Sequence, residues 1–107
     1  MRISFSRTGG FAGIRLAAAF EPGVLSPAVE QDVRQLALHA HFFELPGELQ
    51  SHSPGADRFS YQVSVEDGEH RHEVRISEAA APPALRALLR LLTELAIQHA
   101  RSAPAHH

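Results

Sequence analysis

Histidines are the residues of this sequence most able to bind a metal, and there are eight of them. His70 and His72 lie two positions apart in a stretch that alternates as a strand does, so they share one face at a spacing that can chelate zinc. That face also carries the apolar side chains of the neighbouring predicted strand, and no carboxylate or cysteine at a suitable spacing completes a set of three or four ligands. His39 and His41 point to different faces of a predicted helix. We therefore expect no metal site and no cofactor, with His70 and His72 as partly buried structural residues.

Hydrolytic chemistry requires a nucleophile with a base, or a metal. The chain has no cysteine, no His-Glu-x-x-His and no serine within Gly-x-Ser-x-Gly. Asp57, Asp67 and the glutamates fall at predicted turns or on predicted solvent faces, where their carboxylates are hydrated. The sequence therefore predicts a protein that is not an enzyme.

Three glycines, Gly9, Gly10 and Gly13, surround Phe11. A glycine-rich phosphate site needs a helix N-terminus after it, whereas a strand pattern follows here. Glycines at a hairpin bend supply positive φ angles. An aromatic side chain at such a loop tip either packs back onto the core or anchors a partner, and the residues alone leave both interpretations open.

Composition restricts the class of protein further. A chain of 107 residues with 44% apolar content holds one domain, which we place at residues 1–101, and the tail 102–107 is expected to be disordered. The net charge of −2 provides no general attraction to nucleic acid. No apolar stretch matches a signal peptide or a membrane span, so we expect a cytoplasmic protein with neither a nucleic acid nor a membrane as partner.

Periodicity predicts two strands, a helix, two further strands and a final helix. Residues 2–7 and 14–20 alternate around the glycine-rich connection and form a hairpin. Ser26-Pro27 begins a helix that ends near Phe42, with Glu30 and Arg34 paired on its solvent side. Its predicted apolar stripe is Val29, Val33, Leu36, Ala40 and Phe43. The final helix opens at Pro82-Pro83, and its predicted core residues are Leu85, Leu88, Leu89, Leu92, Leu95 and Ala96.

The strongest local pattern is a hairpin over residues 58–76, with Asp67-Gly68 as its two-residue turn. This turn places four apolar-face pairs opposite each other: Val65 with His70, Val63 with His72, Tyr61 with Val74, and Phe59 with Ile76. On the other face it pairs Gln62 with Glu73 and Ser60 with Arg75. We therefore predict an α+β fold of order ββαββα, in which a four-stranded antiparallel sheet carries both helices on one face.

Several of these segments resemble the emfourin family. Two of them are residues 3–14 (Ile-Ser-Phe-Ser-Arg-Thr-Gly-Gly-Phe-Ala-Gly-Ile) and residues 55–63 (Gly-Ala-Asp-Arg-Phe-Ser-Tyr-Gln-Val). The specific parts are Gly-Gly-Phe-Ala-Gly at 9–13 and Ala-Asp-Arg-Phe-x-Tyr at 56–61. The resemblance continues through residues 41–46, Asp67-Gly68, residues 72–74 and the leucine-rich final helix, so it spans nearly the whole chain.

The resemblance implies a small cytoplasmic bacterial inhibitor of thermolysin-like (M4, protealysin-type) zinc metallopeptidases, whose partner carries the zinc. It suggests that the loop Thr8, Gly9, Gly10, Phe11, Ala12 and Gly13 enters the peptidase cleft. A second contact is expected in the loop over residues 44–56, at Glu44, Leu45, Pro46, Glu48 and His52. The alternative is a non-catalytic interaction module that associates with itself through the surplus leucines of the last helix. We expect a monomer, and a weak homodimer is the alternative.

Overall fold

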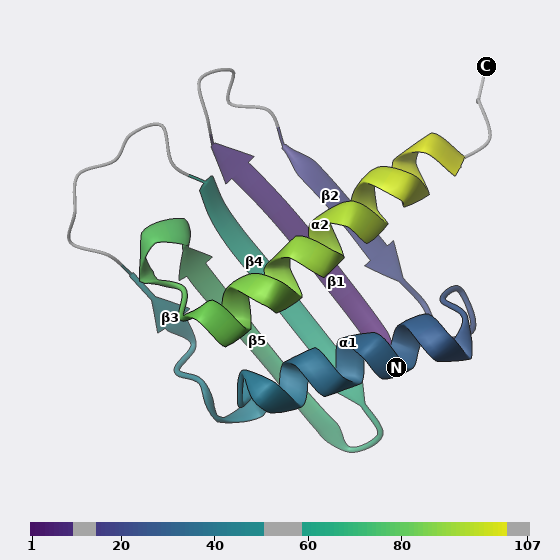
Figure 1. Ribbon diagram of the computed structural model, residues 1–107, viewed down its shortest axis with the longest axis horizontal. Coiled ribbons are helices and arrows are strands. Elements are labelled where there is room, and N and C mark those ends of the chain that lie inside the picture. The colour runs from purple at the N-terminus through teal and green to yellow at the C-terminus, as the bar shows by residue number, and fades with distance from the viewer. Residues whose placement is uncertain (10–14, 51–58, 103–107) are drawn as a thin grey trace.

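The computed structural model describes residues 1–9, 15–50 and 59–102. Within them lies a sheet in the order β2-β1-β4-β5-β3, with both helices on one of its faces (Figure 1). The strands are β1 (Arg2–Gly9), β2 (Leu16–Phe20), β3 (Glu48–Leu49), β4 (Phe59–Asp67) and β5 (His70–Ser77). The helices are α1 (Pro27–His39) and α2 (Pro83–Ser102), and two short 3-10 helices occupy Phe42–Glu44 and Glu78–Ala80. The predicted α+β class and the placement of both helices on one face are confirmed.

The prediction of four antiparallel strands was wrong, because the described sheet has a fifth strand and is mixed. β3 runs parallel to β5, with Glu48 beside Arg75 and Leu49 beside Ile76. The backbone N–H of Arg75 donates to the carbonyl of Gly47 at 2.8 Å, which fixes this segment against the edge of β5. A strand of two residues is too short to produce an alternating pattern, so the sequence predicted a loop here.

The core lies between the helices and the sheet face that they cover. Ile3 and Phe5 of β1 and Phe20 of β2 point into it. Helix α2 begins at Pro83, as its proline pair predicts, and its leucines recur at steps of three and four residues. All the residues predicted to face the core from this helix are buried: Leu85, Leu88, Leu89, Leu92, Leu95 and Ala96.

Helix α1 begins as predicted but ends earlier. The hydroxyl of Ser26 accepts a hydrogen bond from the backbone N–H of Val29 at 3.2 Å, which caps the helix. Its last residue is His39 rather than Phe42, because His41 takes a left-handed conformation (φ +52°) that ends the helix. The chain then turns, so that Phe42 is fully buried.

Two predicted details of this helix differ from the structure: the burial of its apolar stripe and its ion pair. Phe43, Val29 and Leu36, which the stripe placed in the core, are only partly buried, whereas Val33 and Ala40 are buried. The predicted pair of Glu30 with Arg34 does not form among the described residues. Arg34 instead donates to the carboxylate of Asp67 at 3.0 Å, which ties α1 to the end of the β4–β5 hairpin.

The β4–β5 hairpin forms, but its predicted register was wrong by two residues. Val65 lies opposite His72 and Asp67 opposite His70, so the turn residues are Gly68 and Glu69. Gly68 has φ +64°, which suits the first central position of a tight hairpin turn with glycine there. A shift by two keeps every side chain on its predicted face. The Gln62 amide still donates to Glu73 at 3.0 Å, now as a diagonal contact.

Candidate functional site

The two loops predicted to contact a partner border one end of the sheet. Gly9, the last residue before the undescribed segment 10–14, lies directly opposite Phe59, the first residue after the undescribed segment 51–58. We call this end, defined by Thr8, Gly9, Gln50, Phe59 and Ser60, the loop end. The predicted contact residues Gly10, Phe11, Ala12, Gly13 and His52 lie outside the described residues.

The strands hold the loop end firmly. β1 is paired along its length with β4 on one side and with β2 on the other. The guanidinium carbon of Arg7 lies 4.3 Å from the ring centre of Phe59, as in a cation–π contact. Gly9 has φ +115°, a conformation that residues with a side chain rarely adopt. A glycine is therefore required where β1 leaves the sheet.

The sheet face opposite the helices is open and shallow at this end. Thr8, Arg15, Gln50, Ser60 and Arg75 surround a hollow of about 470 Å³ on that face. A second hollow, of about 390 Å³, continues along the face over small side chains: Ser4, Ser6, Ala17, Ala19 and Ser64. The small side chains let a partner approach the strands closely.

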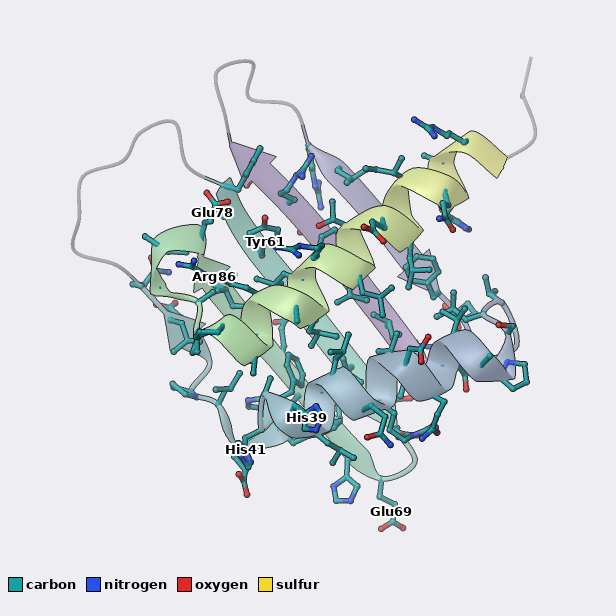
Figure 2. The ribbon with its side chains drawn as sticks, in the orientation of Figure 1. His39, His41, Tyr61, Glu69, Glu78 and Arg86 are labelled. Carbon is teal, nitrogen blue, oxygen red and sulfur yellow. The ribbon has the colours of Figure 1, made fainter. Side chains whose placement is uncertain are left out.

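A third hollow, of about 430 Å³, lies on the helix side of the loop end, between Tyr61 of β4 and helix α2. Figure 2 shows Tyr61, Glu78 and Arg86 around it, and the Nε–H of Arg86 donates to the carbonyl of Ala81 at 2.9 Å. Burial raises the pKa of the Tyr61 hydroxyl, and the nearby carboxylate of Glu78 raises it further, while Arg7 opposes the shift. The hydroxyl therefore stays protonated at neutral pH and can donate a hydrogen bond. No local pattern of residues indicates this hollow, because its lining comes from four separate segments.

The second predicted contact segment is partly structural. Leu45 is half-buried, and its carbonyl lies 2.6 Å from Nε2 of His72. Glu44, Pro46 and Glu48 are exposed along the outer edge of β5, and Glu44 lies 3.3 Å from the ring of His41. These residues are therefore not brought together with Thr8 and Gly9. The chain reaches the loop end only at Gln50.

The histidines that the structure describes do not gather into a ligand set. Besides its contact with Leu45, His72 packs edge-on against the ring of Phe42, with ring centres 5.7 Å apart. His70 is exposed rather than partly buried, and its ring centre lies 5.7 Å from that of Phe43. In residues 1–9, 15–50 and 59–102, no group of three or more potential ligands could hold a metal ion. Over the same residues, no helix combines the length and apolar character needed to cross a membrane.

A sequence model described as Emfourin matches residues 5–93. The match runs from β1 into α2 and includes both segments that border the loop end. The chain belongs to the Emfourin family. The resemblance drawn from the sequence motifs is thereby confirmed.

Among solved structures, the chain is similar to emfourin from Serratia proteamaculans, an M4 family peptidase inhibitor, with 23% sequence identity and a TM-score of 0.43. That match covers 84% of this chain and 86% of the other Emfourin chain. Among curated proteins, none matches this sequence.

Proposed function

We propose that this chain is a protein inhibitor of a thermolysin-like, protealysin-type M4 zinc metallopeptidase. The observation that carries the proposal is membership of the Emfourin family over residues 5–93, a family in which the Serratia proteamaculans protein is an M4 family peptidase inhibitor. An inhibitor needs no catalytic groups of its own, and its partner supplies the zinc. We further propose that the chain acts in the cytoplasm.

The loop end is the surface that we propose meets the peptidase. The direct pairing of Gly9 with Phe59 makes the borders of both predicted contact loops neighbours on one rigid sheet. A rigid platform reduces the entropy that is lost when loops bind. A partner that reaches Thr8 and Gly9 therefore also lies close to Phe59 and Ser60.

Within the loop Thr8 to Gly13, we propose Phe11 as the anchor. Thermolysin-like enzymes bind an extended backbone and prefer a large apolar side chain just after the cleaved bond. Glycines on both sides of Phe11 allow a close approach of the backbone. Of the second contact segment, Glu44, Pro46 and Glu48 keep exposed side chains on the edge of β5 and remain candidates, whereas Leu45 is partly taken up by contacts within the fold.

The variant Phe11→Ala tests the anchor. Burying one phenylalanine is worth about 1.5–3 kcal/mol, so inhibition of a thermolysin-like peptidase should weaken by roughly ten- to a hundredfold. The melting temperature should stay the same, because a side chain that binds the partner adds little to the core. Phe43→Ala is the matched control, since Phe43 is half-buried and lies at the opposite end of the sheet.

The outcomes separate the anchor from a packing role. A normally inhibiting Phe11→Ala variant with an unchanged melting temperature would remove this loop from the mechanism and favour residues 44–56. A variant that inhibits normally but melts several degrees lower would show that Phe11 packs onto the core.

A further inference from the structure

Among the described residues, β2 and β3 are the outer strands of the sheet, and their outer edges differ in how well they are protected. β3 has two residues, one of them Glu48, and follows Pro46-Gly47, so it offers a partner strand little backbone. β2 has five residues, Leu16–Phe20, and carries no charge, proline or glycine. Unprotected edges of this kind pair readily with another strand. The edge of β2 is therefore the place where this sheet can be extended.

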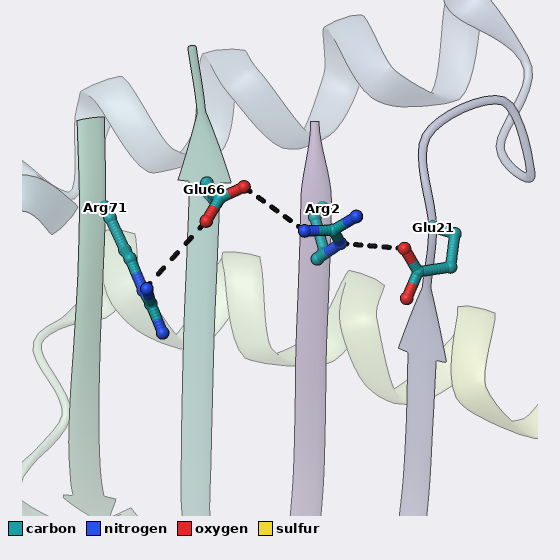
Figure 3. A network of polar contacts seen from close by, with 4 residues as sticks. All are labelled: Arg2, Glu21, Glu66 and Arg71. Carbon is teal, nitrogen blue, oxygen red and sulfur yellow. Dashed lines mark hydrogen bonds and ion pairs between the residues drawn. The ribbon is translucent and has the colours of Figure 1, made fainter. Parts of the chain in front are cut away.

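A row of alternating charges crosses the open face of the sheet and ends at β2 (Figure 3). Arg71 lies 4.0 Å from Glu66, Glu66 lies 3.4 Å from Arg2, and Nε of Arg2 lies 2.7 Å from Oε2 of Glu21. Arg71, Glu66 and Arg2 are directly opposite one another on β5, β4 and β1. Glu21 continues the register of β1 with β2, immediately after Phe20, which lies opposite Ile3. The row therefore ends on an exposed carboxylate at the free edge.

At the other end of β2, Arg15 has no ion pair with any described residue. Continuing the same register places it opposite Thr8 of β1, whose partner on β4 is Ser60, so no carboxylate stands in its row. Arg15 and Glu21 lie at equal distances on either side of Ala18. Both belong to the open face, which also carries the exposed side chains of Ala17 and Ala19.

We propose that two copies of this chain associate through antiparallel pairing of β2 with β2 around Ala18, forming one continuous sheet. In this register, Arg15 of each copy lies opposite Glu21 of the other, so each row of alternating charges gains the cation that it lacks. Leu16 lies opposite Phe20 on the helix side, and alanines meet on the open side. The interface is self-complementary, as a two-fold axis requires.

Charge selects this register over its neighbours. A slip of two residues would place Arg15 opposite Ala19 or Gly23, with no carboxylate to meet it. The core face of β2 is already closed, because Phe20 is 2% exposed and packs against the ring of His99 with centres 5.3 Å apart. Pairing therefore requires no rearrangement of the core. Self-association through the leucines of α2 has less support, because most of them are buried within the chain.

Charge reversal tests this proposal, with sedimentation velocity as the readout. A single strand pair is a small interface and associates weakly, so the protein concentration should range from about 10 µM to 1 mM. The wild-type chain should show a concentration-dependent dimer that weakens in high salt. Arg15→Glu alone, or Glu21→Arg alone, places like charges opposite each other at both ends and should weaken self-association at least tenfold. An equimolar mixture of these two variants restores unlike charges at both ends, so it should form a heterodimer.

Arg90→Glu, on the exposed side of α2, is the matched control and should dimerise like the wild type. Circular dichroism and melting of each variant verify that the fold is intact. A wild-type chain that stays monomeric throughout this range would overturn the proposal. So would a dimer that survives both single reversals, or an equimolar mixture that does not associate. Because none of these readouts involves a peptidase, their failure leaves the proposed inhibition untouched.

Discussion

Replacing His72 with alanine should destabilise this protein, because the side chain holds the segment after α1 against the sheet. Two contacts are lost: the hydrogen bond between Nε2 and the carbonyl of Leu45, at 2.6 Å, and the edge-on packing against Phe42. A hydrogen bond contributes about 0.5–1.5 kcal/mol to the free energy of unfolding. A favourable aromatic pair contributes about 0.5–1.5 kcal/mol. Together they predict a loss of about 1–3 kcal/mol for His72→Ala.

For a domain of this size, that loss corresponds to a fall in melting temperature of roughly 5–20 °C, measured by circular dichroism. His70→Ala is the matched control. His70 lies two residues earlier on the same strand and is exposed, so its replacement should cost less than about 0.5 kcal/mol. Zinc added to the wild-type chain should leave the melting temperature unchanged, because the two histidines lack further ligands among the described residues.

Two results would contradict the structural role of His72. Equal melting temperatures for His72→Ala and the wild type would show that the contact with Leu45 does not stabilise the fold. A rise in melting temperature with zinc that is abolished equally by His70→Ala and His72→Ala would show that the pair binds a metal after all.

Three further substitutions test separate parts of the structure. The hydrogen bond from Arg34 lowers the pKa of Asp67. The pair therefore stabilises the fold above the ordinary pKa of an aspartate, and this contribution is lost as the pH falls through the lowered value. In denaturant titrations, Asp67→Asn should cost about 0.5–1 kcal/mol at pH 7, and this cost should shrink towards pH ~3. An Asp67→Asn variant whose cost is the same at both pH values would contradict this. Gly9→Ala forces a side chain into a φ of +115°, which should cost about 1–3 kcal/mol of stability. If the backbone shifts instead, the start of the loop is distorted and peptidase inhibition should weaken. Unchanged stability together with unchanged inhibition would show that a glycine is not required at this position. Phe42→Ala should cost about 3–5 kcal/mol because Phe42 is fully buried, and Phe43→Ala clearly less; the reverse order would mean that α1 continues past His39.

The parts of the fold that the sequence predicts well are those where local pattern and burial agree. Helix α2 starts at a proline pair, and every leucine assigned to the core is buried there. The β4–β5 hairpin was predicted from its alternation, but alternation cannot distinguish registers that differ by two residues, since both keep the same face buried. The observed turn uses Gly68 with Glu69, one residue further along the chain than the predicted Asp67-Gly68.

Errors arose where distant residues override local preference. Helical spacing pairs Arg34 with Glu30, yet Asp67, 33 residues further along the chain at the end of β4, binds it instead. The two-residue strand β3 depends on the edge of β5, which no local pattern of residues 48–49 reveals. No local pattern indicates the left-handed conformation of His41 either.

The candidate site was only partly accessible to sequence reasoning. The glycines and Phe11 identified the first loop, but the pairing of Gly9 with Phe59 depends on β1 lying beside β4, and the order of strands in a sheet is not encoded in either segment alone. The separation of Leu45 from the loop end depends on its contact with His72, 27 residues away in the sequence, so residues 44–56 alone do not indicate it.

The most direct test of the proposed function is a titration of a thermolysin-like M4 peptidase with the purified chain, with cleavage of a peptide substrate as the readout. At an enzyme concentration above the dissociation constant, activity should fall linearly and vanish near about one equivalent of inhibitor. A zinc peptidase of another family should keep its activity under the same conditions. An M4 peptidase that retains full activity at a roughly hundredfold excess of folded protein would contradict the account.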